Sequence, residues 1–378
     1  MTTVIRAAGA ADFLALVPHL VGFHPARSIV LVPFEGSRSI GALRFDLPPA
    51  DLPDDARDQL AATAIGMVCK VAHADAMAVV VYSDDPVAPR ALPADAVVAA
   101  VLARADMCGV RVVDALCVGA DGWARYLEPD AVHPPLAVAD PPEALGGERP
   151  AGDQLAGSAL PAVDLAEKER VGVALREIER AMSGLFGDAA AVDGRRLPPG
   201  ALAAVCRMDD VPLLFEEAIE HEPAHLDPYD AAALVWCLSR PALRDVALMQ
   251  WAADLDRGDE VYAAQTQWQV GEEYPEHLAA PMWGDGPAPD PDRLARALAL
   301  TRRVAAAAPR AHRPGVLAAA AWLAWATGRS THAAAYCARA LEIEPDHGLA
   351  TLVLQMADAA YLPEWVYRRP GSARRSAT

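Results

Sequence analysis

Lysine and aromatic residues are scarce in this chain of 378 residues, and acidic residues outnumber basic ones. Only two of the 33 basic residues are lysines, Lys70 and Lys168, and aromatic residues make up 6%. The formal net charge of −18 repels the phosphate backbone of nucleic acids, so we expect no nucleic-acid partner. Arginines cluster only at the C-terminal end, where we expect a disordered basic tail at residues 368–378.

Paired cysteines and long apolar runs are also missing. The six cysteines include no C-x-x-C pair, and most lie in apolar segments, which is typical of free thiols in a reducing compartment. The first 13 residues lack the basic and apolar regions of a signal peptide. The longest apolar run, residues 316–326, is shorter than the roughly 18 residues that a membrane helix needs. We therefore expect a cytoplasmic protein without a membrane partner.

The chain contains no phosphate-binding glycine loop, no dinucleotide fingerprint and no G-x-S-x-G nucleophile turn. One metal-binding pattern occurs, His221-Glu-Pro-Ala-His225. Zinc binding by this pattern needs both imidazoles on one face of a helix. Pro223 interrupts such a helix, and Asp227-Pro228 is a typical start for the next one. We therefore expect no metal site and no cofactor.

Residues 1–127 show the alternation of an α/β unit. Helices are expected at residues 10–21, 55–73 and 93–108, and strands at 28–34, 40–47, 76–82, 110–118 and 122–127, the first two strands forming a hairpin. This order predicts a mixed sheet of about five strands with covering helices. The consecutive Val79, Val80 and Val81 predict a central strand that is buried on both faces.

Prolines and glycines are frequent in residues 128–163, which we interpret as a linker or an extended meander. The remainder, residues 164–367, is expected to be an all-helical domain without strands. Helices are predicted at residues 165–186, 199–206, 211–221, 228–238, 241–255, 260–274, 291–308, 314–327, 330–343 and 347–361.

The last helices carry a local repeat pattern. Gly328, Ala333, Ala340 and Pro345 have the spacing of the second helix of a tetratricopeptide repeat. A single hairpin is not an array, so both a helical-bundle hairpin and a repeat-type surface remain open. The packing residues expected between helices 314–327 and 330–343 are Leu317, Ala321, Ala324, Ala333, Cys337 and Ala340.

Two tryptophans on the first helix of this pair, Trp322 and Trp325, are candidate anchors for a protein partner. Aromatic side chains often dominate interfaces. If a partner binds beside the helix pair, at least one of the two should be partly exposed.

The N-terminal sequence resembles a known family. The pattern D-F-L-A-L-V-P-H-L-V-G-F-H-P-A-R-S-I-V-L-V-P-F, residues 12–34, followed by A-L-R-F-D-L-P, is similar to that of an actinobacterial domain-of-unknown-function family (DUF4192-like). Residues 243–247, 339–345 and 363–365 fit the same family. Its members carry a Cys-Cys-Pro-like segment after the fifth strand, but residues 125–135 of this chain contain no cysteine. The resemblance implies a fold and no activity.

Polar residues near the ends of the predicted strands form a candidate ligand site: His24, Arg44, Asp46, Ser83, Asp84 and Asp85. Arg44 and Asp46 share one face of a strand because side chains alternate. Ser83 to Asp85 follow the carboxyl end of the central strand, where ligands of open α/β sheets bind. The alternative is structural, with a turn at Asp84-Asp85-Pro86 and an ion pair between Arg44 and Asp46.

Two classes of function remain. The first is a non-enzymatic interaction or regulatory protein, with a partner surface on the helical half and ligand sensing in the α/β half. The second is an enzyme of hydrolase or transferase type with a site near Asp46 and Ser83. The missing nucleophile, metal and phosphate motifs favour the first class. A concave pocket lined by these polar groups would support a ligand site, and an exposed apolar patch on the helical half would support a partner.

Overall fold

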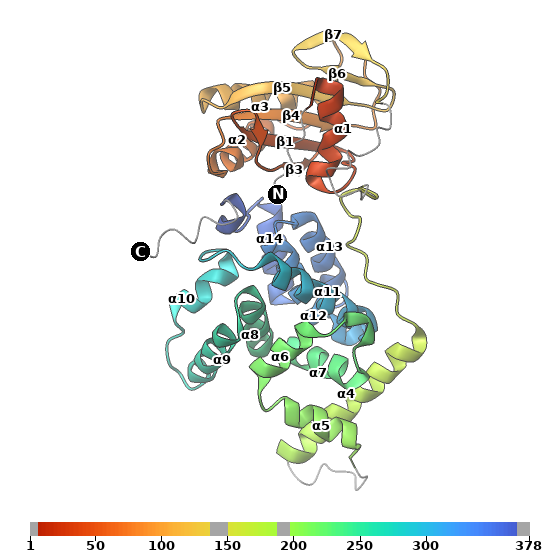
Figure 1. The fold of residues 1–378 in the computed structure, drawn as a ribbon, viewed down its shortest axis with the longest axis vertical. Coiled ribbons are helices and arrows are strands. Elements are labelled where there is room, and N and C mark those ends of the chain that lie inside the picture. The colour runs from red at the N-terminus through yellow and green to blue at the C-terminus, as the bar shows by residue number, and fades with distance from the viewer. Residues whose placement is uncertain (1–6, 137–149, 187–196, 369–378) are drawn as a thin grey trace. The chain divides into compact units, whose positions relative to one another are not determined.

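The computed structural model describes residues 7–136, 150–186 and 197–368. The chain divides into two compact units, Met1–Ala156 and Gly157–Thr378, here called the α/β unit and the helical unit (Figure 1). The expected basic tail after Arg368 and residues 137–149 of the expected linker lie outside the described residues.

A mixed sheet forms the centre of the α/β unit. Its strands are β1 (Ser28–Glu35), β2 (Arg38–Ser39), β3 (Leu43–Asp46), β4 (Ala76–Tyr82), β5 (Arg111–Val118), β6 (Trp123–Arg125) and β7 (Glu128–His133). The order is β2-β1-β4-β5-β6-β7, with β3 also paired to β1, and only β4 and β5 run parallel.

The sheet has seven strands where about five were expected. The predicted hairpin is present, but its second arm is divided into β2 and β3, both of which pair with β1. The seventh strand, β7, lies in the segment that the sequence analysis assigned to a linker. Its partner is β6, with Trp123 opposite His133 and the two rings stacked at 4.1 Å.

Strand β4 is central and buried on both faces, as predicted. Met77, Val79 and Val81 pack on the side of helices α2 (Asp54–Lys70) and α3 (Asp95–Met107). Val80 joins the cluster on the opposite face, beneath α1 (Ala10–Val21) (Figure 1). Alternate side chains of β4 therefore pack into two separate cores, one on each face of the sheet.

The described part of the helical unit contains no strand. Its helices are α4 (Leu165–Phe186), α5 (Pro199–Arg207), α6 (Val211–Glu220), α7 (Pro228–Leu238), α8 (Pro241–Ala252), α9 (Leu255–Gln269), α10 (Glu276–Ala279), α11 (Pro291–Ala307), α12 (Arg313–Ala326), α13 (Ser330–Leu341) and α14 (Gly348–Asp358). The largest displacement from prediction is α9, which was expected at residues 260–274. Asp254 caps its first turn by accepting a hydrogen bond from the Arg257 backbone at 3.0 Å, so the helix begins earlier.

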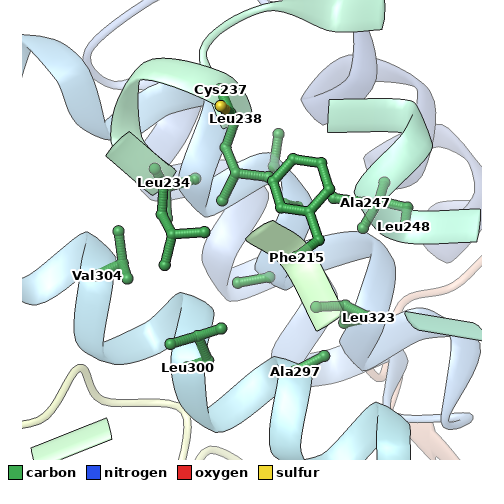
Figure 2. Close-up of a cluster of buried hydrophobic side chains, with 14 of the residues drawn as sticks. Phe215, Leu234, Cys237, Leu238, Ala247, Leu248, Ala297, Leu300, Val304 and Leu323 are labelled. Carbon is green, nitrogen blue, oxygen red and sulfur yellow. The ribbon is translucent and has the colours of Figure 1, made fainter. Parts of the chain in front are cut away.

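One apolar core holds these helices together. Figure 2 shows Phe215 of α6 among side chains of α7, α8, α11 and α12, including Leu234, Leu248 and Leu323. Within the described residues, no helix is both long enough and apolar enough to cross a membrane.

Helices α12 and α13 form the predicted hairpin. Gly328 takes the left-handed conformation, with φ of 77°, and the Arg329 backbone N–H donates to the Ala324 carbonyl at 2.9 Å. All six predicted packing residues, from Leu317 to Ala340, are buried. The tetratricopeptide-like character of this hairpin stays a prediction.

Neither Trp322 nor Trp325 is exposed, as a partner surface beside the helix pair would require, so the two are core residues and not candidate anchors. Both side chains have 0% exposure. Their indole N–H groups donate to backbone carbonyls, Trp322 to Met282 at 3.0 Å and Trp325 to Tyr361 at 2.8 Å. These residues pack in the core because neighbouring segments cover the helix on which they lie.

Candidate functional site

A cavity of about 360 Å³ opens at the carboxyl end of β4. It lies wholly within the α/β unit, on the side of the sheet that α2 and α3 cover. Its walls are the segment after β3, the turn after β4 and the beginnings of α2 and α3. The lining residues are Arg27, Leu47, Pro48, Pro49, Ala50, Leu52, Arg57, Ser83, Asp84, Asp85, Pro93, Ala94, Asp95, Ala96 and Val97.

The turn after β4 brings three predicted site residues, Ser83, Asp84 and Asp85, to this cavity. The Ser83 backbone N–H donates to the Val118 carbonyl at 2.9 Å, which ties the turn to β5. The Ser83 hydroxyl accepts from the Asp85 backbone N–H at 3.1 Å and lies 3.2 Å from the Asp85 carboxylate. The turn chemistry that the sequence offered as an alternative is therefore present, and the same turn lines a cavity.

The opposite wall is the beginning of α3. Ala94 precedes the helix in the left-handed conformation, with φ of 56°, and contributes no capping side chain. The first N–H groups of a helix have no partner inside it and carry partial positive charge. The cavity thus meets the positive end of a 13-residue helix, with the Asp95 carboxylate beside it.

Two arginines complete the polar lining. Arg57 donates to the Leu52 carbonyl at 3.1 Å and pairs with Asp54 at 2.8 Å, so its side chain is held in place. Arg27 has a left-handed backbone, with φ of 45°, and its carbonyl accepts from the Leu47 N–H at 2.8 Å. Arg27 and Arg57 therefore line the same cavity as Asp84 and Asp85 of the turn.

Backbone strain accompanies this site. Arg27 and Ala94 are two of the five non-glycine residues with positive φ in the described part of the chain. Such conformations cost on the order of 1–3 kcal/mol each and are enriched at binding and catalytic sites.

Arg44 and Asp46 do not line the cavity. The neighbouring residues Leu43 and Phe45 pack on the α2–α3 side of the sheet, so the alternation of β3 directs Arg44 and Asp46 to the other face. There Arg44 donates to the buried Ser28 hydroxyl at 2.8 Å and pairs with Asp46. The structure therefore separates this ion pair from the Ser83–Asp85 turn.

His24 is exposed and also lies outside the cavity lining. Its backbone N–H donates to the Gly152 carbonyl at 2.9 Å. The Gln154 side chain forms two hydrogen bonds with the Ala26 backbone, at 3.2 and 3.1 Å. These hydrogen bonds with residues 152–154 hold the backbone around His24 in place.

Tyr82, opposite Ser28 in the sheet, carries a buried hydroxyl. No hydrogen-bond partner for it occurs within the described residues. Burial raises the pKa of this phenol well above its usual value. Tyr82 packs with the α1-side core, so it belongs to the face that carries Arg44.

The two histidines of the H-E-x-x-H pattern lie in different segments of the chain, as predicted. His221 is the residue that ends α6, and His225 lies in a short 3₁₀ turn, Pro223–His225. The His221 Nδ1 atom is 2.6 Å from the Glu217 carbonyl oxygen. Among the described residues, no group of three or more His, Cys, Asp or Glu side chains is arranged to hold a metal ion.

A polar network in the helical unit joins three helices. Arg293 of α11 binds both carboxylate oxygens of Glu216 of α6, at 2.7 and 2.8 Å. The Gln250 amide of α8 donates to the same carboxylate at 2.9 Å. The hydrogen bonds from Arg293 lower the pKa of Glu216. Because these groups come from three packed helices, we interpret the network as structural.

Sequence reasoning missed the arginines and the α3 wall of the cavity. Pro93-Ala-Asp95 marks the start of a helix at the same edge of the sheet, which is a usable signal for that wall. Nothing in the sequence pattern distinguishes Arg27 or Arg57 from other surface arginines.

Comparison with known proteins identifies a family for this chain. Residues 11–281 match the model of a family described as a domain of unknown function (DUF4192), and this range includes every residue that lines the cavity. No curated protein and no solved structure matches the chain.

Proposed function

Because the chain belongs to the DUF4192 family, whose description assigns no activity, we propose a function from the cavity itself. The α/β unit is a non-enzymatic sensor of a small polar ligand, and the helical unit offers a surface for a protein partner. The protein works in a reducing compartment, the cytoplasm, in keeping with its six free cysteines.

The observation that carries this proposal is the cavity at the carboxyl end of β4. Its volume of about 360 Å³ lies within the range of small-molecule sites. Guanidinium groups such as those of Arg27 and Arg57 bind carboxylates and phosphates, whereas carboxylates accept hydrogen bonds from hydroxyl and amino groups. The ligand expected for this lining is small and polar, with an anionic group and hydrogen-bond donors.

The state of Ser83 favours binding over catalysis. A nucleophilic serine is usually activated by an adjacent base such as histidine. Here the Ser83 hydroxyl is engaged with Asp85 in a turn, and no histidine, cysteine or lysine lines the cavity. The enzyme alternative placed Asp46 and Ser83 in one site, but Asp46 lies on the other face of the sheet.

A ligand screen with matched variants tests the proposal. The full chain is heated with single compounds from a panel of amino acids, sugar phosphates and nucleotides. A ligand at about 100 times its Kd adds roughly 2.7 kcal/mol of stability, which raises Tm by several degrees. The increase should persist in Asp46→Asn, an exposed carboxylate outside the cavity, and disappear in Asp84→Asn and Arg27→Ala.

The same screen separates the alternatives. If no compound raises Tm, or if the increase survives Asp84→Asn and Arg27→Ala, the cavity is not the ligand site. If the stabilising compound is chemically converted when followed by NMR, the protein is an enzyme and the sensor proposal fails.

A second observation supports the partner surface. Trp283 is 47% exposed and Tyr361 is 36% exposed. The Tyr361 hydroxyl donates a hydrogen bond to the Trp283 carbonyl at 2.9 Å, so the two residues lie side by side. Exposed aromatic residues often anchor interfaces. These residues replace Trp322 and Trp325 as the proposed anchors.

Affinity capture from the native host with a paired control tests this surface. A partner that binds here should be recovered with wild-type protein and with Trp268→Ala, which removes an exposed tryptophan on α9. It should be lost with Trp283→Ala. Equal recovery with both variants contradicts the proposed surface.

A further inference from the structure

The segment that joins β4 to α3 lines the cavity at both of its ends, residues 83–85 and 93–94, but not in its middle, residues 86–92. It is called the β4–α3 segment below. In the middle, the side chains of Val87 and Leu92 are buried in the core cluster that α2 and α3 cover. The shape of this cavity wall therefore depends on what holds the middle of the segment.

The turn between β5 and β6 holds the first half of the β4–α3 segment. The Asp121 carboxylate accepts a hydrogen bond from the Val87 backbone N–H at 2.8 Å. The Ala120 backbone N–H donates to the Asp85 carbonyl at 3.1 Å. Gly119 lies so close that a Cβ atom on it would be 2.5 Å from the same carbonyl oxygen. Three consecutive residues of one turn therefore fix the backbone beside the cavity.

The connection from β6 to β7, at the edge of the sheet (Figure 1), holds the second half of the segment. The Arg90 backbone N–H donates to the Pro129 carbonyl at 3.0 Å, and the Arg90 side chain binds the Asp130 carboxylate at 2.6 and 3.2 Å. The Tyr126 hydroxyl donates to the Pro93 carbonyl. Contacts with β5, β6 and their connections thus extend from one lining end of the segment to the other.

We propose that Asp121 is a positioning residue for the cavity: it holds the turn that carries Asp84 and Asp85 in the shape that binds ligand. This inference rests on the ligand site proposed above. Asp121 does not itself line the cavity, so it acts on a ligand only through the turn. A hydrogen bond from a backbone N–H to an ionised carboxylate is stronger than one to a neutral acceptor. A wall that is already ordered loses less freedom when a ligand binds, so affinity rises.

Four variants separate this role from a general contribution to stability. Asp121→Ala removes the acceptor, whereas Asp121→Asn keeps an oxygen acceptor at the same position. Gly119→Ala displaces the Asp85 carbonyl without removing a hydrogen-bonding group. Asp75→Ala is the matched control: its carboxylate accepts from the Gly36 backbone N–H at 3.0 and 3.2 Å, at the end of β4 opposite the cavity.

Hydrogen exchange of the full chain without ligand is the first test. In Asp121→Ala, residues 83–93 should exchange faster than in the wild type, and at more amides than that of Val87 alone, because the whole turn loosens. Asp121→Asn should stay close to the wild type, and Asp75→Ala should leave this segment unchanged. A change confined to the Val87 amide, or no change, overturns the proposal.

Ligand binding is the second test. Every amino acid, sugar phosphate or nucleotide that stabilises the wild type is titrated into the variants by calorimetry. Asp121→Ala and Gly119→Ala should each raise Kd roughly tenfold, and Asp121→Asn should largely restore it. Asp75→Ala should lower Tm about as much as Asp121→Ala but leave Kd unchanged. If Gly119→Ala does not fold, the two variants of Asp121 decide the result.

The outcomes distinguish this proposal from the proposed function. An unchanged Kd in Asp121→Ala overturns the positioning role even though the cavity remains the ligand site. If no compound binds the wild type, the proposed function fails, and the exchange experiment alone decides whether Asp121 holds the turn.

Discussion

Gly315, near the start of α12, lies directly against the backbone carbonyl of Leu238 at the end of α7. A Cβ atom at position 315 would be 2.3 Å from that oxygen and 2.9 Å from the Cα atom of Ser239. Both neighbours are backbone atoms, so no side-chain rotation relieves the overlap. Glycine is therefore what allows α12 to pack closely on the turn between α7 and α8.

Gly315→Ala should destabilise the helical unit by roughly 1–3 kcal/mol because the helices must move apart. Urea unfolding measures the change. Gly348→Ala is the matched control: it also lies in the first turn of a helix, α14, but nothing lies within 4 Å of its added Cβ. Equal stability of the two variants would mean that α12 does not approach the turn so closely.

Ala340→Leu should destabilise by a similar amount, roughly 1–3 kcal/mol, because Ala340 is fully buried between α13 and its neighbours. Ala338→Leu, on the exposed side of the same helix, controls for the intrinsic helix preference of leucine. Thermal unfolding of both variants tests the packing of the hairpin. An unchanged Tm in Ala340→Leu would contradict it.

Val80→Asp should prevent folding of the α/β unit. Val80 is fully buried in the central strand, where an unpaired carboxylate costs several kcal/mol. Val80→Ala should still fold, with a loss of roughly 2 kcal/mol. Val113→Asp, at a position that is 48% exposed in the adjacent strand β5, should be milder than Val80→Asp. Circular dichroism and soluble yield report the result, and a cooperatively melting Val80→Asp protein would refute the central placement.

The stability of the helical unit should fall in weak acid because of His347. This residue caps α14 and is 8% exposed; its Nδ1 atom accepts from the Ala350 N–H at 3.3 Å. Burial and then the positive charge of Arg244 lower the pKa of His347 below 6.5, against an opposing effect of Glu344. The unfolded chain therefore binds a proton at a higher pH than the folded chain. The stabilisation is complete above about pH 6.5 and is lost as the pH falls towards the folded pKa.

Urea unfolding at several values between about pH 7 and pH 5 measures this dependence. His347→Asn keeps a capping side chain and removes the titration, so its stability should vary less with pH. His277→Asn, at an exposed position, should retain the wild-type slope. An identical slope in His347→Asn would exclude His347 as the source.

Local chemistry made several elements predictable from the sequence. Helix α7 was predicted with its observed bounds because Asp227 caps the first turn and Pro228 begins it. Strand β4 was predicted because consecutive valines are tolerated only where both faces are covered. Gly328 ended α12 as expected because glycine adopts the left-handed conformation without steric cost.

Side-chain environments depended on segments distant in the chain. Trp322 and Trp325 were candidate anchors because aromatic side chains often dominate interfaces, yet residues near 282 and 361 cover them and accept their indole hydrogen bonds. Arg44 and Ser83 were grouped because both lie near strand ends. The pleat of β3 sends Arg44 to the face opposite the cavity, which no property of residue 44 alone determines.

The sequence by itself determined the α/β and helical halves, most helix starts and the buried central strand, because these follow from interactions within a few residues. Only the tertiary structure decided which arginines line the cavity and which tryptophans are buried. Both depend on the packing of elements that are separated in the chain, and residue type and spacing carry little information about such packing.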